Sequence, residues 1–255
     1  MNVETNIAAK TYAHEALQLL TAVAAKAEPN VEAAARLFAR CLKADGVIHA
    51  FGTGHSQATA MEVAGRAGGF VPTNRISLSD VVMFGGADPA TLADPMLERQ
   101  ADAASRLYEL AKVQPQDLFV ISSNSGVNGA IVQLALLVKE RGHDLVALTS
   151  LDHSYRVPAR HESGKRLADL ADVVLDNGAP YGDAMFTTAH GDSACAVSSL
   201  SAALLVQMTV AQAVRILLDE GVRPPLYVSA NVPDGPERNR ALEARYAGRI
   251  RRIAS

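Results

Sequence analysis

The chain has few cysteines, no tryptophan and few aromatic residues. Its 255 residues include only Cys41 and Cys195, and aromatic side chains make up 5% of the sequence. Two widely separated cysteines argue against a disulfide framework or a zinc knuckle and fit a reducing compartment. The net charge of −3 provides no basic excess for a nucleic-acid backbone. We therefore expect a cytoplasmic protein that does not bind nucleic acid.

Long apolar runs are also scarce. The first twenty residues are interrupted by Glu4, Lys10 and Glu15, so we expect no signal peptide there. Residues 193–214 carry no charge and are long enough to span a bilayer. However, seven side chains in this stretch are hydroxyls or amides. We expect a buried or interface helix here and no contact with a membrane.

The remaining composition is that of an ordinary globular chain, with 49% apolar and 20% charged residues. Apolar spacing predicts an N-terminal helix pair over residues 4–27 and 31–42, with a break at Pro29. Beyond it, helical segments alternate with apolar runs that predict strands near 46–51, 70–76, 117–122, 144–149 and 171–175. This alternation predicts an α/β fold, a three-layer α/β/α sandwich around a flavodoxin-like parallel sheet.

One compact domain accounts for the chain, with residues 1–45 as a helical extension and 46–255 as the ligand-binding part. Four arginines near the C-terminus are expected to be the solvated end of a helix: Arg245, Arg249, Arg251 and Arg252. Ligands of open parallel sheets bind beyond the carboxyl ends of the strands. The loops after Phe51, Ile121, Thr149 and Leu175 are therefore the ones to search.

The first of these loops reads Gly52-Thr53-Gly54-His55-Ser56. Gln57 follows where a dinucleotide-binding fingerprint requires a third glycine, which disfavours an oxidoreductase. The hydroxyls of Thr53 and Ser56, beside free amides at a helix N-terminus, predict an anion site. An ordinary turn capped by a serine is the alternative.

The second loop is richer in donors. It reads Ser122-Ser123-Asn124-Ser125-Gly126-Val127-Asn128 and opens the next predicted helix. Hydroxyl and amide side chains surround a glycine where backbone amides point outward, and the helix dipole favours a negative charge. Together the two loops predict a cradle for a phosphate group.

These two loops resemble the signature loops of the sugar isomerase (SIS) domain family, whose members bind phosphosugars. Further similar segments are Arg66–Gly69, Ser150–His153, Arg160–Lys165, Asp176–Gly178, Gly182-Asp183 and Ser229–Asn231. Over about residues 46–231 the chain is similar to single-SIS-domain bacterial proteins of the phosphosugar-binding or phosphoheptose isomerase-like kind. The resemblance implies a sugar phosphate ligand, no cofactor, and a homodimer or higher homo-oligomer.

The chain departs from the family pattern at two positions. Asn128 stands where the second loop usually has a threonine, although an amide also donates to phosphate. Glu62 lies about one helical turn closer to Ser56 than the corresponding glutamate of phosphoheptose isomerases lies to its own serine. This offset places the carboxylate differently.

Glu62 is the first candidate for a catalytic base. Its neighbours Met61 and Val63 predict a largely buried segment, and burial would raise the pKa of the carboxyl group. In SIS isomerases the matching helix supplies the glutamate that moves a proton between C1 and C2 through an enediol. The alternative is a structural ion pair with Arg66, four residues later.

His161, in a polar loop, is the candidate acid and base for ring opening, with an ordinary surface histidine as the alternative. Lys165 could neutralise a phosphate, or be a solvated cation. Three residues after the last strand could hold sugar hydroxyls or, with His153 or His190, a divalent cation: Asp176, Asn177 and Asp183. Turn formation is favoured for them. Metal-ligand spacing is missing, so we predict no metal.

The sequence thus predicts a protein that binds a phosphorylated sugar and catalyses cofactor-free aldose–ketose isomerisation. Elimination or deamination on an amino-sugar phosphate begins with the same proton abstraction and stays open. The alternative is a non-catalytic phosphosugar sensor that acts through a protein partner. The resemblance also implies that residues 229–231 close the site, and the residues themselves give no other support for this role.

Overall fold

A computed structural model describes residues 7–94 and 96–252. Its centre is a five-stranded sheet in the order β2-β1-β3-β4-β5, with every pairing parallel. The strands are β1 (Ile48–Gly52), β2 (Thr73–Ile76), β3 (Leu118–Ser122), β4 (Asp144–Thr149) and β5 (Val173–Asp176). The predicted α/β class and flavodoxin-like strand order are confirmed. Strand order reverses between β1 and β3, which is the expected position for a ligand.

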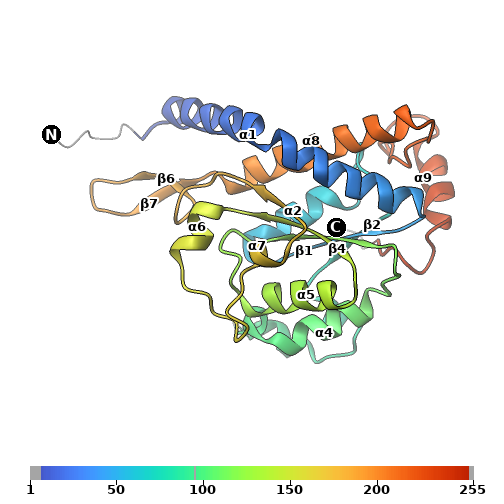
Figure 1. Cartoon of the computed structure of the whole chain (residues 1–255), viewed down its shortest axis with the longest axis horizontal. Helices are drawn as coiled ribbons and strands as arrows, with labels where there is room; N and C mark the ends of the chain where they lie inside the picture. The colour runs from blue at the N-terminus through green and yellow to red at the C-terminus, as the bar shows by residue number, and fades with distance from the viewer. Residues whose placement is uncertain (1–6, 95, 253–255) are drawn as a thin grey trace.

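Helices cover both faces of the sheet (Figure 1). One face packs against α1 (Ala9–Lys43), α2 (Gln57–Val63) and α8 (Ser198–Asp219), through a core that includes Ile48, Val120 and Leu148. The other face packs against α4 (Ala101–Leu110), α5 (Gly129–Glu140) and α7 (Leu167–Leu170), through Phe51, Phe119 and Ile121. Neighbouring residues of one strand therefore serve opposite cores, as the two-residue period of a strand requires.

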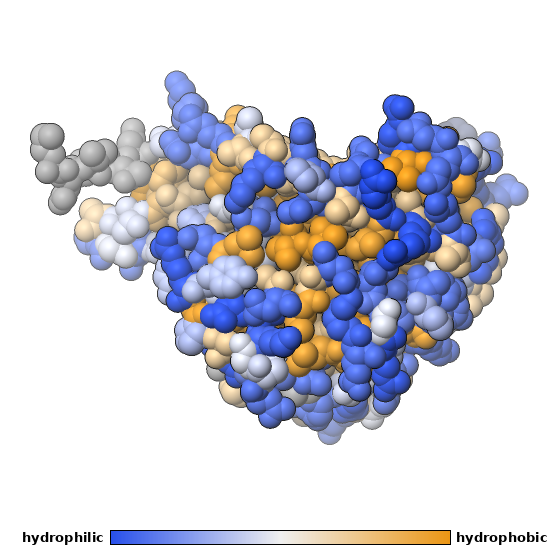
Figure 2. Space-filling model, in the orientation of Figure 1, coloured by the Kyte–Doolittle hydropathy of each residue, from blue (hydrophilic) through white to orange (hydrophobic). Residues whose placement is uncertain are grey.

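Shorter elements complete the chain. They are the 3-10 helices η1 (Gly54–Ser56), η2 (Pro89–Ala93) and η3 (Leu97–Arg99), the helices α3 (Asp80–Met83), α6 (Leu151–Arg156) and α9 (Gly235–Ala244), and the antiparallel hairpin β6 (Ala184–Thr187) with β7 (Ser193–Ala196). The hairpin projects from one end of the molecule in Figure 1. Figure 2 shows an apolar band across the middle of the viewed face, below α1, within otherwise polar surface.

The predicted break between two N-terminal helices is wrong, because both segments belong to the single helix α1 with Pro29 inside it. A proline in a helix interior costs about 3 kcal/mol. Val23, Ala27, Val31 and Ala34 are buried on both sides of Pro29, and they belong to one hydrophobic core with α8. Continuous burial against α8 outweighs the lost hydrogen bond, and α1 bends instead of ending (Figure 1).

The uncharged stretch, residues 193–214, is helical as predicted except for its first residues. Residues Ser193–Ala196 form β7, and the helix starts only at Ser198. Asp183 sets this start, because its Oδ1 accepts hydrogen bonds from the amides of Val197 and Ser198. Helix α8 is long and apolar enough to cross a membrane by length and composition; 44% of its most apolar window is buried within the chain.

Among the four C-terminal arginines, Arg245 is the solvated helix end that the sequence predicts, since it directly follows α9 and its side chain is 56% exposed, whereas the prediction is wrong for the other three. Helix α9 ends at Ala244, and the segment after it runs along the amino edge of the sheet. Arg249 pairs there with Asp117 and Arg251 with Asp80, and both arginine side chains are only 17% exposed. Both aspartates are buried near strands of the sheet, so each requires a cation.

Candidate functional site

Polar side chains line a hollow at the carboxyl edge of the sheet. Strand β1 ends at Gly52 and its neighbour β3 ends at Ser122, so the two predicted loops leave the sheet side by side. The hollow is small: its volume of ≈ 10 Å³ is about the space of one water molecule. Its lining comprises His55, Ser56, Thr59, Ser122, Asn124, Asn177, Ser198, Ser199 and Ala202.

The first loop turns back tightly after β1. A Cβ atom on Gly52 would lie 2.4 Å from the carbonyl oxygen of Ser56, so only glycine permits this close approach. Gly54 has a φ of +55°, which also favours glycine. The turn presents His55 and Ser56 to the hollow, followed by Thr59 on α2, whereas Thr53 is buried outside the lining.

The predicted phosphate-binding residues of the second loop have two different roles. Ser122 and Asn124 line the hollow. The hydroxyl of Ser123 instead accepts a hydrogen bond from the amide of Gly126 at 3.1 Å, which holds the turn. Asn128 donates to Glu98 Oε1 at 3.2 Å. Ser123, Gly126 and Asn128 thus maintain the loop in this structure, and Ser125 lies outside the lining.

The sequence analysis misses three polar residues of the lining, Thr59, Ser198 and Ser199, and names Asn177 with turn formation as its favoured role. Asn177 follows β5 and donates through Nδ2 to Asn124 Oδ1 at 2.8 Å, which fixes both amides. Ser198 and Ser199 open α8, and Ser198 Oγ donates to Asp183 Oδ2 at 2.5 Å. Thr59 lies on α2. The two adjacent serines in the uncharged stretch could have indicated a binding site at a helix start. The sequence instead predicts a helix from residue 193, five residues before α8 begins at Ser198.

The chemistry of the hollow suits an anion held by neutral donors. Among the residues that the structure describes, His55 is the single titratable group of the lining, and the other polar groups are hydroxyls and amides. The N-terminal end of helix α8 lies at the same place, where the Asp183 carboxylate already caps the amides of Val197 and Ser198. The side chains of Ser56, Ser122 and Ser199 form no hydrogen bond within residues 7–94 and 96–252. Their hydroxyls remain available to a ligand.

Glu62 lies one helical turn beyond Thr59 on α2 and outside the lining of the hollow. Its carboxylate pairs with Arg66 and accepts a hydrogen bond from Gln207 Nε2 of α8 at 2.6 Å. The side chain is 19% exposed. The ion pair that competed with a catalytic role is therefore present, and the carboxylate lies where α2 contacts α8.

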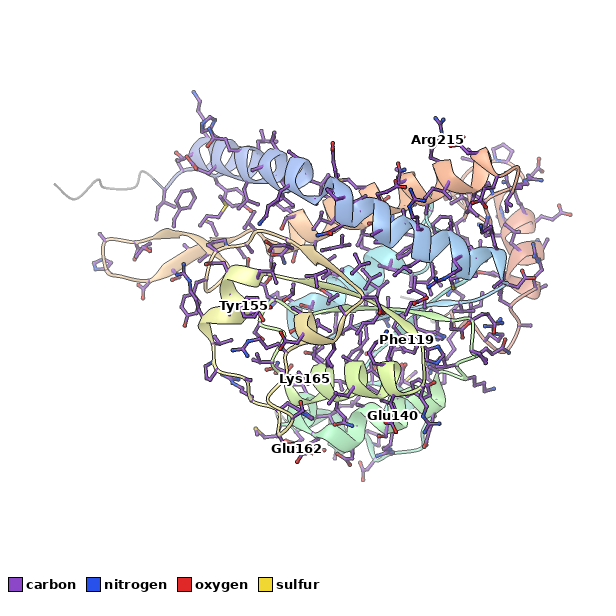
Figure 3. The ribbon with its side chains drawn as sticks, viewed as in Figure 1. Phe119, Glu140, Tyr155, Glu162, Lys165 and Arg215 are labelled. Carbon is purple, nitrogen blue, oxygen red and sulfur yellow. The ribbon has the colours of Figure 1, made fainter. Side chains whose placement is uncertain are left out.

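His161 and Lys165 lie on the other side of the sheet. His161 Nε2 is 3.0 Å from Gln133 Oε1 of α5, and its Nδ1 is 2.9 Å from Ser163 Oγ. Lys165 is exposed, and Figure 3 shows it with Glu162 on the α5 side, away from α1 and α8. Within one chain the structure does not bring either residue to Glu62.

The acidic residues after β5 serve the fold. Asp176 Oδ1 accepts from the amides of Leu151 and Gly178, and its Oδ2 pairs with Lys26 at 3.1 Å. Asp183 caps α8 as described. His153 Nδ1 accepts from the amide of Gly182 at 2.9 Å. Among the residues that are described, no group of three or more His, Cys, Asp or Glu side chains could hold a metal ion.

Comparisons with known proteins agree with this arrangement. Residues 11–150 match the family model described as SIS domain. A UPF0309 protein of Listeria monocytogenes is 41% identical over 222 residues, which are 87% of this chain and 89% of that protein. A UPF0309 protein of Caldanaerobacter subterraneus is 35% identical over 228 residues, 88% of this chain and 91% of its own length.

Solved structures show the same fold. A phosphoheptose isomerase from Francisella tularensis superposes with a TM-score of 0.55 at 17% identity, over 80% of this chain and 95% of that one. The phosphoheptose isomerase from Neisseria gonorrhoeae gives a TM-score of 0.52 at 22% identity, over 78% and 93% of the two chains. At these identities the likeness concerns the fold alone.

Proposed function

The chain belongs to the SIS-domain family, and we propose from this membership and from its site that the hollow binds the phosphate group of a phosphosugar. One observation carries the proposal. Two loops and the start of α8 bring hydroxyl and amide donors to one point at the carboxyl edge of the sheet, and no carboxylate of the described residues lines it. A phosphate oxygen accepts several such donors.

Matched sugars test this binding. Glucose, fructose, glucosamine and N-acetylglucosamine are compared with their 6-phosphates in a thermal-unfolding assay. A ligand at 100 times its Kd stabilises the folded chain by about 2.7 kcal/mol, which raises Tm by roughly 5–10 °C for a chain of this length. We expect stabilisation by phosphorylated members only. An equal response to the unphosphorylated sugars would contradict a phosphate site.

Variants locate the site. The double substitution Ser56→Ala and Ser122→Ala removes two hydroxyls that the chain itself does not use, so Kd for a responding phosphosugar should rise about tenfold or more. The control is Ser105→Ala on α4, an exposed serine on the other face of the sheet. Equal Kd values for the double variant and for wild type would show that phosphate binds elsewhere.

For catalysis we propose that Glu62 removes the proton beside the sugar carbonyl, in isomerisation or in elimination and deamination. Its support is position: Glu62 follows Thr59 by one turn on the α2 face that meets α8. The carboxylate must first leave Arg66 or Gln207 to reach a substrate. No cofactor is needed, because an enediol-type step only moves a proton.

Exchange of the C2 proton with D₂O, followed by NMR, detects this step whatever the product. Glu62→Gln should slow exchange by about a hundredfold or more while Kd stays within twofold of wild type. Glu140→Gln, an exposed glutamate on α5, is the matched control. Undiminished exchange in the Glu62 variant would remove this residue from the mechanism.

A non-catalytic sensor is the second candidate. The observation that favours it is the engagement of Glu62 with both Arg66 and Gln207, outside the lining of the hollow. A wild-type chain that binds a phosphosugar but exchanges no C2 proton would support this function.

The role of His161 in ring opening and that of Lys165 in charge neutralisation depend on a second copy of the chain. Neither residue lines the hollow, and His161 contacts α5 on the other face of the sheet, so we place both at the site of a neighbouring subunit. We propose a homodimer or higher homo-oligomer, and light scattering on the purified chain measures its mass. A monomeric mass would exclude His161 and Lys165 from the site.

A further inference from the structure

Three side chains meet where α2 contacts α8. Glu62 pairs with Arg66, four residues later, and Gln207 of α8 donates through Nε2 to the same carboxylate at 2.6 Å. Both donors bind Oε1. Within the residues that the structure describes, Oε2 accepts no hydrogen bond, and it is not among the buried atoms that lack a partner. One oxygen of this carboxylate is therefore held twice, and the other reaches solvent.

A second set of the same three residue types lies between α1 and α8. Glu32 of α1 pairs with Arg36, also four residues later, and accepts a hydrogen bond from Gln212 of α8. Here the two donors are divided, with Arg36 at Oε1 and Gln212 at Oε2. The chain thus uses both oxygens of Glu32. This set has the contacts of a structural link between two helices, whereas the Glu62 set leaves one oxygen unused.

Helix α8 gives Gln207 a defined position. Gln207 and Gln212 are five residues apart, which is about 140° around the helix axis, so they face the two different helices that pack against α8. Val206 and Val210, on either side of Gln207 along the helix, are buried in the core that α8 shares with α1 and α2. The amide of Gln207 therefore approaches Glu62 from a fixed part of the molecule.

Arg66 is held less firmly than Gln207. It lies beyond the end of α2, between Gly65 and Gly68, and its side chain is 47% exposed. An exposed ion pair contributes little to stability, because water and salt screen it. When the carboxylate exchanges one partner for a substrate, Arg66 is therefore the partner that leaves and Gln207 is the one that stays.

We propose that Gln207 is a positioning residue: it holds Glu62 Oε1 during proton transfer, so that Oε2 faces the substrate. This inference rests on the proposed function of Glu62 as the base. The proton beside the carbonyl passes to Oε2, and the electron pair of the C–H bond stays on the substrate as an enediolate. Oε2 then returns the proton to the neighbouring carbon in an isomerisation. A donor to the carboxylate also favours its charged form, which is the form that accepts a proton.

Gln207→Leu removes the donor and keeps a side chain of similar size, and leucine is a good helix former, so α8 should stay intact. Exchange of the C2 proton with D₂O at saturating phosphosugar should slow about tenfold or more. The acid limb of its pH profile should move to higher pH, which a loss of packing alone would not cause. Kd should stay within twofold of wild type, because Gln207 does not line the hollow.

Gln212→Leu is the matched control. It removes the same kind of donor from Glu32 on the same helix, at a carboxylate outside the proposed reaction. The exchange rate, its pH profile and Kd should equal those of wild type. Equal slowing by both variants, or an unmoved pH profile in the Gln207 variant, would overturn the proposal.

A ¹³C NMR titration of the Glu62 carboxyl group in the ligand-free chain separates this inference from the proposed catalysis. The midpoint of the titration should rise in Gln207→Leu and stay unchanged in Gln212→Leu. If the wild-type chain exchanges no C2 proton, the proposed catalysis fails, and the titration still decides whether Gln207 holds the carboxylate. An unmoved midpoint in Gln207→Leu would show that Gln207 does not position Glu62.

Discussion

The two edges of the central sheet handle polar groups in opposite ways. At the carboxyl edge the hollow is lined by hydroxyls and amides, and Ser56, Ser122 and Ser199 make no side-chain hydrogen bonds within the described chain. At the amino edge Asp117, whose side chain is fully buried, accepts hydrogen bonds from the amides of Val47 and Gln114 and from Arg249. His49 lies 3.1 Å from the same carboxylate.

The difference separates stability from binding. A hydroxyl that faces a hollow is hydrated without a ligand, so it costs little to leave it without a protein partner. A buried carboxylate must be paired, and loss of its partner is strongly destabilising. We therefore expect the amino edge to control the free energy of unfolding and the carboxyl edge to control affinity for ligands.

The largest expected effect is at Asp117. Asp117→Asn keeps the shape but removes the charge that faces Arg249 and one acceptor of its network, so the free energy of unfolding should fall by about 3 kcal/mol or more. Urea denaturation measures the change. Asp219→Asn, at an exposed pair with Arg215, is the control and should show none. Phosphosugar affinity should be unchanged in both variants; equal stability of the two would contradict the contrast between the edges.

The next effect is at the carboxyl edge. Gly52→Ala places a Cβ 2.4 Å from the Ser56 carbonyl oxygen, so the first loop must move and Kd for a phosphosugar should rise about tenfold or more. Gly54→Ala meets no atom within 4 Å and adds only the cost of its positive φ, about 1 kcal/mol. Calorimetric titration at a temperature where both variants are folded compares them. A smaller Kd change in the Gly52 variant than in the Gly54 variant would contradict this account of the loop.

Local patterns suffice to predict the sheet and the two loops. A short apolar run, followed by glycine and serine, is visible within about ten residues of sequence. Parallel strands then place Gly52 and Ser122 at one edge without further information. For this reason the sequence alone predicts Ser56, Ser122 and Asn124 as binding residues, and all three line the hollow.

The rest depends on contacts between distant segments. Ser198 and Ser199 line the hollow because Asp183 caps α8. The β6–β7 hairpin separates Asp183 from Ser198 in sequence, and no apolar periodicity predicts this hairpin. Pro29 stays inside α1 because α8 covers both sides of it. Arg249 and Arg251 become buried because they pair with Asp117 and Asp80. These two aspartates lie far from the arginines in sequence, so no local pattern predicts the pairs. In each case a tertiary partner overrides a local preference.

The smallest expected effect is a pH dependence that belongs to the amino edge alone. Burial lowers the pKa of His49 below its ordinary 6.5, with Asp117 opposing the shift and Arg249 and Arg251 adding to it. Burial also lowers the pKa of His143, whose Nε2 lies 2.8 Å from the Tyr108 hydroxyl. The unfolded chain therefore binds more protons than the folded chain below about pH 6.5.

Stability should consequently be complete above about pH 6.5 and decrease as the pH falls toward 5, by at most about 1.4 kcal/mol per pH unit for each histidine. Urea denaturation of the ligand-free chain between pH 8 and 5 measures this slope. His143→Gln should reduce the slope, whereas His190→Gln, at an exposed position of the hairpin loop, should leave it unchanged. If the slope disappears in the His190 variant and persists in the His143 variant, the pH sensitivity lies outside the buried network. The amino edge would then not be the part of the molecule that controls stability at low pH.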